Sequence, residues 1–373
     1  MPNSRVWLDV DLTAIAKNFK VIRNAVKPCE LMVVLKANAY GLGMLPIAEH
    51  LVSLGATRFG VAELKEALAL KKRFPKLPVQ ILSGLLEQEV DECVRHKIIC
   101  PISSPTMARW ISRAAVRQKR KAKVHFKVDT GMGRLGFPHL QAAAQIAAAL
   151  KLPGLVAEGI LSHFSSANNP QDGKNREQLS NFRAVLDELN AKGFEFPLVH
   201  MANSDAIHNL PEALSAPFNL ARTGVNLYGV FDLEGTHAYL LKPTLTLQTK
   251  LLSRRLLQAG HTIGYGCTHT LSRDTWVGTV PAGYADGIPL AASNAGHVLI
   301  RGQSCPVIGR VSMDYITVDL TPCPQAREGD LVTVVGRSGK SKISIEDWAR
   351  IKQTHPYEII CALGPRVERG YKG

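Results

Sequence analysis

The chain has 373 residues, of which 46% are hydrophobic and 20% charged, and its formal net charge is +14. These proportions exclude a disordered, collagen-like or fibrous protein, and the length allows one large domain with a smaller one beside it. No apolar run approaches the roughly 18–20 residues of a membrane-spanning helix, and residues 1–11 lack the pattern of a signal peptide. We therefore expect a cytoplasmic protein with no membrane partner.

The seven cysteines are scattered along the chain, and no two form a Cys-x-x-Cys pair. This spacing predicts reduced, mostly buried thiols, and neither a disulfide framework nor a metal site. The densest basic segment is residues 117–123, RQKRKAK. It has no interleaved aromatic residues, so a solvated loop between a helix and the next strand is favoured over a nucleic-acid site. An anionic ligand would explain part of the positive charge equally well.

Between residues 30 and 230, short β-branched runs alternate with longer amphipathic segments. The predicted strands are Leu31–Lys36, Phe59–Ala62, Val79–Ser83, Ile98–Ile102, Val124–Val128, Val156–Ser162, Leu198–Ala202 and Asn219–Arg222. The predicted helices are Glu63–Phe74, Ser104–Gln118, Leu140–Leu150 and Gln178–Lys192. Eight strands with intervening helices predict an α/β TIM barrel, (β/α)8, with an open doubly wound sheet as the alternative.

After about residue 240 the sequence becomes rich in β patterns punctuated by Gly and Pro. The predicted strands are Thr244–Leu252, Val298–Arg301, Cys305–Val311, Ile316–Leu320 and Leu331–Val335. The segment Ser344–Lys352 is the one predicted helix. We therefore expect a barrel domain over residues 1–240 and a mainly β domain over residues 241–373.

The most informative segment is residues 33–43, VVLKANAYGLG, in which an apolar strand ends at Lys36 and the chain turns at once. In a barrel, this position places a lysine at the catalytic mouth. Apolar surroundings lower the pKa of an ammonium group and favour an amine that can form a Schiff base. A lone lysine at a strand end is more often a surface residue, but the neighbouring pattern favours the catalytic interpretation.

This segment closely resembles the pyridoxal-phosphate lysine motif of the alanine racemases, fold-type III enzymes built from a TIM barrel and a β domain. Further matches follow in the family's order: KVDTGMGRLG at 127–136, SHF at 162–164, HMANS at 200–204, RTGVNLYG at 222–229, IGYG at 263–266, GYADG at 283–287 and GRVSMDYI at 309–316. The resemblance covers nearly the whole chain. It implies interconversion of L-alanine and D-alanine, which supplies D-alanine for cell-wall peptidoglycan.

The resemblance also implies the residues that hold the cofactor, pyridoxal 5'-phosphate. Lys36 would bind it as a Schiff base and then act as the base on one face of the substrate Cα. The other cofactor-binding residues implied are Tyr40, His163, Ser204, Arg222, Gly224 and Val225. Arg222 would donate to the pyridine nitrogen, and because guanidinium keeps its proton, that nitrogen would stay unprotonated.

Racemisation also needs an acid or base on the opposite face, and by resemblance this is Tyr265. A phenol has a pKa near 10, so it needs a partner, and the family supplies one through a run of hydrogen bonds that here would join Tyr265, His163 and Arg222. Tyr265 would come from the other subunit of a homodimer, as would Met313, whose backbone amide contacts the substrate.

Two further residues are implied at the substrate. Arg134 would bind the carboxylate of the small amino-acid substrate, and Lys127 matches the lysine that family members carry as a carbamate. His200 and Asn203 could instead be ordinary hydrogen-bonding residues at a strand end. Asp314 is expected to be structural.

Three rival interpretations remain. Residues 131–136 fit the G-x-G-x-x-G pattern of dinucleotide-binding folds, but that pattern should open directly into a helix and Phe137–Pro138 interrupts it. A decarboxylase of related architecture would offer the pyridine nitrogen a carboxylate instead of Arg222. A cofactor carrier of the single-barrel type would lack the β domain and its tyrosine.

The chain departs from the family at two positions near the expected substrate entrance. Leu290 stands where an arginine is usual, and Pro365 stands where a tyrosine is common. Both changes make the entrance less polar, so a racemase that accepts amino acids other than alanine is the alternative function. Harmless variation at the rim explains the two residues equally well.

Overall fold

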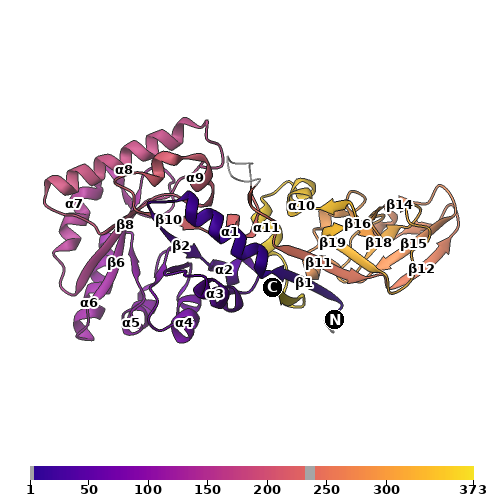
Figure 1. Ribbon diagram of the computed structural model, residues 1–373, viewed down its shortest axis with the longest axis horizontal. Helices are drawn as coiled ribbons and strands as arrows, with labels where there is room; N and C mark the ends of the chain where they lie inside the picture. Colours follow the sequence, from indigo (N-terminus) through magenta and orange to yellow (C-terminus); the bar gives the residue numbers. More distant parts are fainter. Residues whose placement is uncertain (1–3, 232–239) are drawn as a thin grey trace.

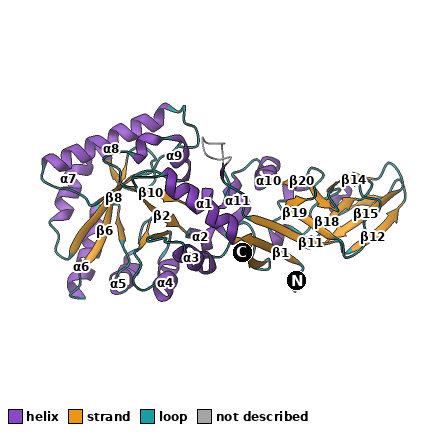
Figure 2. Cartoon of the chain, in the orientation of Figure 1, coloured by secondary structure: helices purple, strands orange, loops and turns teal. Residues whose placement is uncertain are grey.

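The computed structural model describes residues 4–231 and 240–373. The molecule is elongated, with a barrel surrounded by helices at one end and a β-rich part at the other (Figures 1 and 2). The C-terminus lies near the junction of these two parts (Figure 1). Among the described residues, no helix combines the length and apolar character needed to cross a lipid bilayer.

Eight parallel strands close into a barrel. They are β2 (Glu30–Val34), β3 (Phe59–Val61), β4 (Val79–Ile81), β5 (Cys100–Ile102), β6 (Ala122–Asp129), β8 (Leu155–Leu161), β9 (Leu198–His200) and β10 (Leu220–Thr223). Two parallel ladders, β10-β2-β3-β4 and β5-β6-β8-β9, account for most of the pairing. A parallel bridge from Gln80 to Ile99 closes one seam, and the amide of Arg222 donates to the carbonyl of Ala202 (3.1 Å) across the other. The predicted TIM barrel is therefore confirmed, and the open doubly wound sheet is wrong.

Helices surround the barrel (Figure 2). They are α1 (Leu12–Ala25), α3 (Met44–Ser53), α4 (Leu64–Arg73), α5 (Val90–Arg95), α6 (Pro105–Arg117), α7 (His139–Leu150), α8 (Gly173–Ala191) and α9 (Ser204–Asn209). Their starts follow capping chemistry: Ser104 accepts from the amide of Met107 (3.2 Å) before α6, and Asp172 accepts from the amide of Lys174 (2.9 Å) before α8. The sequence prediction began α8 five residues late, at Gln178, because the capped first turn is polar.

The other part of the molecule is mainly β, as predicted. One sheet contains β17 (Gln303–Pro306), β16 (His297–Ile300), β19 (Leu331–Ser338), β11 (Leu245–Lys250), β1 (Val6–Asp11) and β21 (Glu368–Lys372), with β20 (Ser341–Ile343) paired to β19. A smaller sheet contains β12 (Ser253–Leu257), β15 (Thr275–Val280) and β18 (Ile316–Asp319). The hairpin of β13 (Thr262–Ile263) and β14 (His269–Thr270) and the helices α10 (Ile345–Lys352) and α11 (Pro356–Cys361) complete it.

Strand β1 was not predicted, and it joins the sheet of the C-terminal half. It pairs antiparallel with β11 and parallel with β21. The predicted strand Cys305–Val311 is too long, because β17 ends at Pro306, which lacks an amide donor, and Gly309 turns with φ 75°. The division of the chain near residue 240 stays a prediction, since β1 crosses between the two parts.

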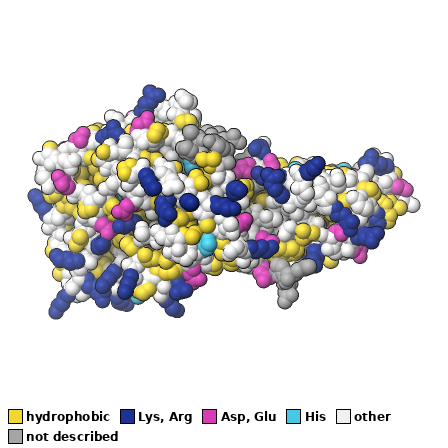
Figure 3. Space-filling model, viewed as in Figure 1, with side chains coloured by type: hydrophobic (Ala, Val, Ile, Leu, Met, Phe, Trp, Pro, Cys, Tyr) yellow, Lys and Arg dark blue, Asp and Glu magenta, His cyan; other side chains and the backbone are white. Residues whose placement is uncertain are grey.

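The basic segment at residues 117–123 links α6 to β6, as predicted. Three of its cations contact protein acceptors: Arg117 pairs with Asp91, Lys123 lies 2.8 Å from Glu158, and Arg120 donates to the Arg95 carbonyl at 2.8 Å. Figure 3 shows Lys and Arg side chains gathered along the lower left edge, over the region of α4 to α6.

The seven cysteine thiols are free, and five of them are buried. The two exposed thiols are Cys267 and Cys361. The prediction of mostly buried thiols is therefore confirmed.

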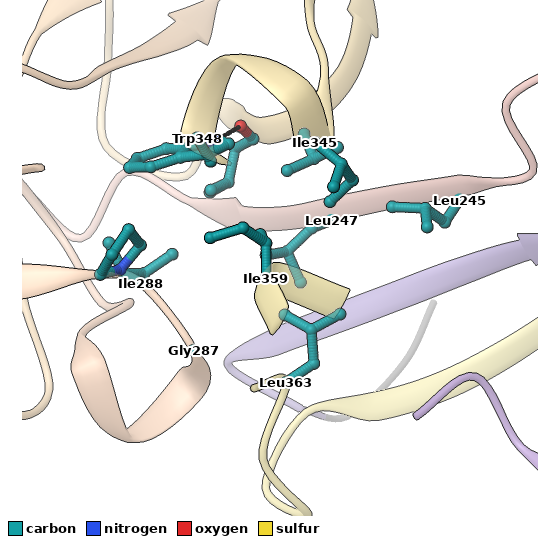
Figure 4. Close-up of a pocket in the computed structure, with 11 residues that line it drawn as sticks. Leu245, Leu247, Gly287, Ile288, Ile345, Trp348, Ile359 and Leu363 are labelled. Carbon is teal, nitrogen blue, oxygen red and sulfur yellow. Dashed lines mark hydrogen bonds between the residues drawn. The ribbon is translucent and has the colours of Figure 1, made fainter. Parts of the chain in front are cut away.

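An apolar junction holds α10 and α11 against β11 (Figure 4). Ile345 and Trp348 of α10 and Ile359 of α11 face Leu247 across a small apolar pocket. The indole of Trp348 donates to the carbonyl of Val334 (3.0 Å), so its polar nitrogen is satisfied inside this core. The packing fixes α11, which reaches the barrel mouth: a Cβ on Gly41 would lie 3.0 Å from the Ile360 carbonyl oxygen.

Strand β21 connects the junction to the turn after β2. The Arg369 guanidinium donates to the carbonyls of Gly41 (3.0 Å), Leu363 (2.7 Å) and Gly364 (2.6 Å), and also to that of Val367. The Tyr371 hydroxyl donates to the Leu42 carbonyl (2.9 Å). The last strand of the chain therefore fixes the segment that follows the first strand of the barrel.

We predict that Arg369→Met lowers the free energy of unfolding by about 2–4 kcal/mol, because a half-buried carbonyl that loses its donor costs roughly 1–3 kcal/mol. Urea denaturation followed by circular dichroism measures this change. Arg176→Met, at an exposed position of α8, is the matched control and should change the unfolding midpoint little. Equal midpoints for the two variants would contradict the role assigned to Arg369.

Candidate active site

A cavity of about 970 Å³, part of it open to solvent, lies at the carboxyl ends of the barrel strands. It is lined by Val34, Lys36, Tyr40, Val61, Ala62, Leu82, Ser83, Lys127, Arg134, Leu135, Leu161, His163, Asn203, Ser204, Arg222 and Gly224. Active sites of TIM-barrel enzymes occupy this end. Its size suits a small cofactor together with a small substrate.

Lys36 begins a left-handed turn directly after β2. Strand β2 ends at Val34, and the four residues from Ala37 to Tyr40 have φ between 52° and 56°, followed by Gly41 at 84°. A left-handed conformation costs roughly 1–2 kcal/mol per non-glycine residue, and such strain persists only where the surroundings enforce it. The strand predicted to run to Lys36 therefore ends two residues early, because the chain turns sharply to place the lysine at the cavity.

Side chains from neighbouring elements hold this turn. Glu66 of α4 accepts from the amides of Asn38 (3.1 Å) and Ala62 (3.0 Å), and Asn38 accepts from the amide of Met44 (2.8 Å). Together with Arg369, these contacts offset the backbone strain.

Cationic side chains surround the cavity, and none of its lining residues is Asp or Glu. Desolvation by the cavity walls lowers the pKa of Lys36, and the positive charges of Arg134 and Arg222 lower it further. The pKa of Lys127 falls to about 8, first through burial and then through Arg134 and Arg222. Its amine donates to the Leu82 carbonyl (3.0 Å). This concentration of positive charge favours an anionic ligand.

The loop that carries Arg134 is shaped by Asp129. One carboxylate oxygen of Asp129 accepts from the amides of Gly131 (3.0 Å), Met132 (2.9 Å) and Gly133 (3.1 Å). Burial alone would raise the pKa of Asp129, but these backbone donors outweigh it and lower the pKa. The loop thus forms a tight turn that directs Arg134 to the cavity.

The same loop does not open directly into a helix. Its next residues form β7 (Phe137–Pro138), which pairs in parallel with β6, and α7 starts only at His139. This geometry differs from that of a dinucleotide-binding fingerprint. The residues that match G-x-G-x-x-G therefore form the turn that carries Arg134.

Arg222 is buried in the barrel and contacts uncharged acceptors. It donates to Nδ1 of His200 (2.7 Å) and Nδ1 of His163 (3.0 Å), and to the carbonyls of Ser162 (3.0 Å) and Met201 (2.9 Å). Burial lowers the pKa of Arg222 to about 9. Its Nε–H has no acceptor among the described residues, so this donor remains for a ligand in the cavity.

Gly224 and Ser204 form a small cradle beside Tyr40. The amide of Gly224 donates to Oγ of Ser204 (2.9 Å). A Cβ on Gly224 would lie 2.3 Å from the Tyr40 hydroxyl oxygen, so only glycine fits there. Val225 follows at the start of a 3₁₀ helix, Val225–Tyr228. Asn203 caps α9 by accepting from the amide of Ala206 (3.0 Å), which is the structural role considered for it.

The structure brings eight of the eleven predicted site residues together at the cavity. Of the other three, Val225 is buried next to Gly224 and does not line the cavity. Lys36, Tyr40, Lys127, Arg134, His163, Ser204, Arg222 and Gly224 line the cavity. Tyr265 and Met313 do not line it: they lie in the β-rich part, 73% and 52% exposed. Leu290 and Pro365 are also exposed outside the cavity, and Asp314 is paired with Arg366 (2.8 Å).

Comparison with known proteins agrees with this arrangement. A model of the alanine racemase N-terminal domain matches residues 10–232, and one of the alanine racemase C-terminal domain matches residues 244–371. The chain belongs to the alanine racemase family. An alanine racemase of Syntrophobacter fumaroxidans is 39% identical over 96% of this chain and 95% of its own. An alanine racemase of Geobacter sulfurreducens is 39% identical over 97% of this chain and 96% of its own.

Solved alanine racemases have the same fold. The enzyme from Streptomyces lavendulae superposes with a TM-score of 0.94 at 34% identity, covering 100% of this chain and 98% of that chain. The enzyme from Bartonella henselae, solved with covalently bound pyridoxal phosphate, gives a TM-score of 0.90 at 30% identity and covers 100% of both chains. The resemblance inferred from the motifs is confirmed.

Sequence reasoning missed three polar residues of the barrel. His125 and Glu158 lie within strands β6 and β8, and Asp129 ends β6. A polar residue inside an otherwise apolar strand could have indicated them, because burying such a side chain costs free energy unless it has a hydrogen-bond partner. His200 was weighed only as a strand-end hydrogen-bonding residue, and the structure places it in contact with Arg222.

Proposed function

We propose that this chain is a pyridoxal-phosphate-dependent alanine racemase with two bases. The observation that carries the proposal is one cavity that is lined both by Lys36, at the start of a strained turn, and by Arg222, with no carboxylate among the described lining residues. A decarboxylase that offers its pyridine nitrogen a carboxylate does not match this cavity. By family membership, the product D-alanine would serve cell-wall peptidoglycan, and the free thiols suit the reducing cytoplasm.

The cavity fits the cofactor. The part of the cavity wall formed by Gly224, Ser204 and Tyr40 offers a glycine backbone and two hydroxyls, which suit a phosphate group, and the surrounding cations favour its charge. Val225 would add a second backbone amide there. Bound pyridoxal phosphate supplies an electron-withdrawing system that acidifies the Cα of an attached amino acid.

The residues of this chain would then transfer the Cα proton and bind the charged groups of the substrate and the cofactor. Lys36, whose pKa is lowered by desolvation, would take or return the proton on one face of Cα. Arg134 would bind the substrate carboxylate. Arg222 would direct its free Nε–H at the pyridine nitrogen, and because guanidinium gives up its proton reluctantly, it would leave that nitrogen unprotonated.

Lys127 would carry a carbamate that orients Arg134. The support is electrostatic: a buried amine among cations, with a pKa lowered to about 8, loses its proton more readily than an ordinary lysine and gains from becoming an anion. The neutral amine would attack carbon dioxide, forming a carbon–nitrogen bond and releasing one proton.

The second base would be Tyr265 from the partner in a homodimer. Exposed apolar side chains on the loops of the β-rich part support this: they are Tyr265, Tyr284, Leu290, Met313 and Tyr315. These loops are joined by hydrogen bonds, such as that from the amide of Tyr284 to the Ser312 carbonyl (3.0 Å). Groups of exposed apolar side chains mark protein interfaces. His163 accepts from Arg222 at Nδ1, so in its neutral form Nε2–H would point to the incoming phenol.

The Tyr265→Phe variant should keep its yellow bound cofactor and lose racemisation at least 100-fold, because it lacks the proton carrier on one face. In deuterated water, exchange of the α-proton should persist for D-alanine and be lost for L-alanine. Chiral chromatography and proton NMR measure the two effects. Unchanged racemisation would refute the two-base assignment.

The Gly224→Ala variant should raise the dissociation constant of pyridoxal phosphate at least tenfold, because its methyl group occupies the cradle. Titration of apoprotein with the cofactor, followed by absorbance, measures this. Gly173→Ala at the start of α8 is the matched control, since a Cβ there meets nothing within 4 Å. Equal affinity in the two variants would place the phosphate elsewhere.

With carbon-13-labelled bicarbonate, NMR should show a carbamate signal that is absent in Lys127→Arg. Since the pKa of Lys127 is about 8, down from 10.5, the neutral amine predominates above pH 8, and occupancy should rise between about pH 7 and 9. The same signal in both proteins would exclude Lys127 as its source.

The function itself is tested by incubating the cofactor-loaded protein with each common L-amino acid and separating the enantiomers. Interconversion of alanine is expected. Leu290 and Pro365 motivate the alternative of broader specificity, which predicts comparable kcat/KM for serine or lysine. An alanine preference above about 100-fold would exceed what one or two methylenes supply and would reject that alternative. No interconversion of any amino acid would overturn the proposed function.

A further inference from the structure

A line of hydrogen bonds crosses the interior of the barrel below Arg222. Arg222 of β10 donates to Nδ1 of His200 in β9 (2.7 Å), Nε2 of His200 lies 2.9 Å from Nδ1 of His125 in β6, and Nε2 of His125 lies 3.1 Å from the Glu158 carboxylate in β8. Both imidazoles are fully buried. Barrel interiors are ordinarily filled with branched apolar side chains, so this line of polar groups is unusual.

The far end of the line is anchored near the amino ends of the strands. Glu158 is paired with Arg58 (2.9 Å), the residue before β3, and with Lys123 (2.8 Å), the second residue of β6. Burial would raise the pKa of Glu158, but the hydrogen bond from His125, Lys123 and Arg58 outweigh it and lower the pKa strongly. The carboxylate is therefore charged and can only accept hydrogen bonds.

Arg222 and Glu158, at the two ends of the line, determine which nitrogen of each histidine carries the proton. Guanidinium only donates, so Nδ1 of His200 must accept, and its neutral ring then carries the proton on Nε2. That proton faces Nδ1 of His125, which must accept and so carries its own proton on Nε2, facing Glu158. Burial lowers the pKa of both imidazoles, which keeps them neutral. All donors and acceptors match in this one arrangement.

We propose that Glu158 is a positioning residue for Arg222, acting through the tautomers of His125 and His200. This inference rests on the proposed function, because it takes Arg222 as the residue that would face the cofactor. Without an acceptor at position 158, His125 can adopt the other tautomer, in which its proton lies on Nδ1 and faces His200. His200 must then place its own proton on Nδ1, where it meets the donors of Arg222. The guanidinium would be displaced from the cavity, and its Nε–H would no longer be held towards the ligand.

The first test reads the tautomers of the apoprotein by nitrogen-15 NMR after histidine labelling, with His125→Gln and His200→Gln used to assign the signals. Neutral rings protonated at Nε2 are expected for both residues. A charged ring, or a proton on Nδ1 at either histidine, would overturn the proposal. This reading needs no cofactor, so it stands apart from the proposed racemase activity.

The second test compares three variants by the same NMR signals and by the dissociation constant of pyridoxal phosphate. Glu158→Met removes the acceptor, and we expect Nδ1–H tautomers and at least tenfold weaker cofactor binding. Glu158→Gln keeps a hydrogen-bond acceptor without the charge, so it should retain most of the Nε2–H tautomers and most of the cofactor affinity. Lys123→Met removes an exposed partner of Glu158 and should resemble the original protein.

The comparison separates positioning from a structural ion pair. If the charge pairing with Arg58 alone matters, Glu158→Gln will be as damaging as Glu158→Met, and that result would overturn the proposal. Normal cofactor affinity in Glu158→Met alongside altered tautomers would also overturn it. If Glu158→Met fails to fold, Glu158→Gln and the tautomers of the original protein still decide the question.

Discussion

The structure depends on one buried positive charge, that of Arg222, held by neutral acceptors inside the barrel. A buried charge without a counterion is costly unless every donor is matched. Two imidazoles and two backbone carbonyls accept from the terminal nitrogens of this guanidinium, its Nε–H is left for a ligand, and none of its hydrogen-bond partners among the described residues is a carboxylate. Its charge therefore remains available to the cavity, where Lys36, Lys127 and Arg134 add to it. An anionic ligand is the natural complement, and its binding should also stabilise the fold.

The second constraint is the left-handed turn at Lys36. The turn is strained, and it is held partly by residues far away in the sequence, namely Glu66 and Arg369. Arg369 comes from the last strand, which pairs with the first strand of the chain. The position of Lys36 therefore depends on the β-rich part as well as on the barrel.

Much of this could be predicted from the sequence, because local patterns carry it. The barrel strands are short apolar runs between amphipathic helices, and the family motifs identified the cavity residues. Strand β1 was missed because its partners, β11 and β21, lie more than 200 residues away and no local pattern reveals such pairing. The contact between His125, His200 and Glu158 was missed for a related reason: it depends on the register of β6, β8 and β9. The position of Tyr265 outside this cavity was implied only by the family resemblance, which places its contacts on another chain; no local pattern of this chain indicates it.

We expect an arginine, Arg222, and not an acid to face the cofactor ring. Nitrogen-15 NMR of the protein loaded with ring-labelled pyridoxal phosphate tests this most directly. We predict the chemical shift of an unprotonated pyridine nitrogen across the neutral pH range, since Arg222 would donate to that nitrogen. A shift typical of a protonated pyridinium would contradict the account and would indicate an acidic partner in its place.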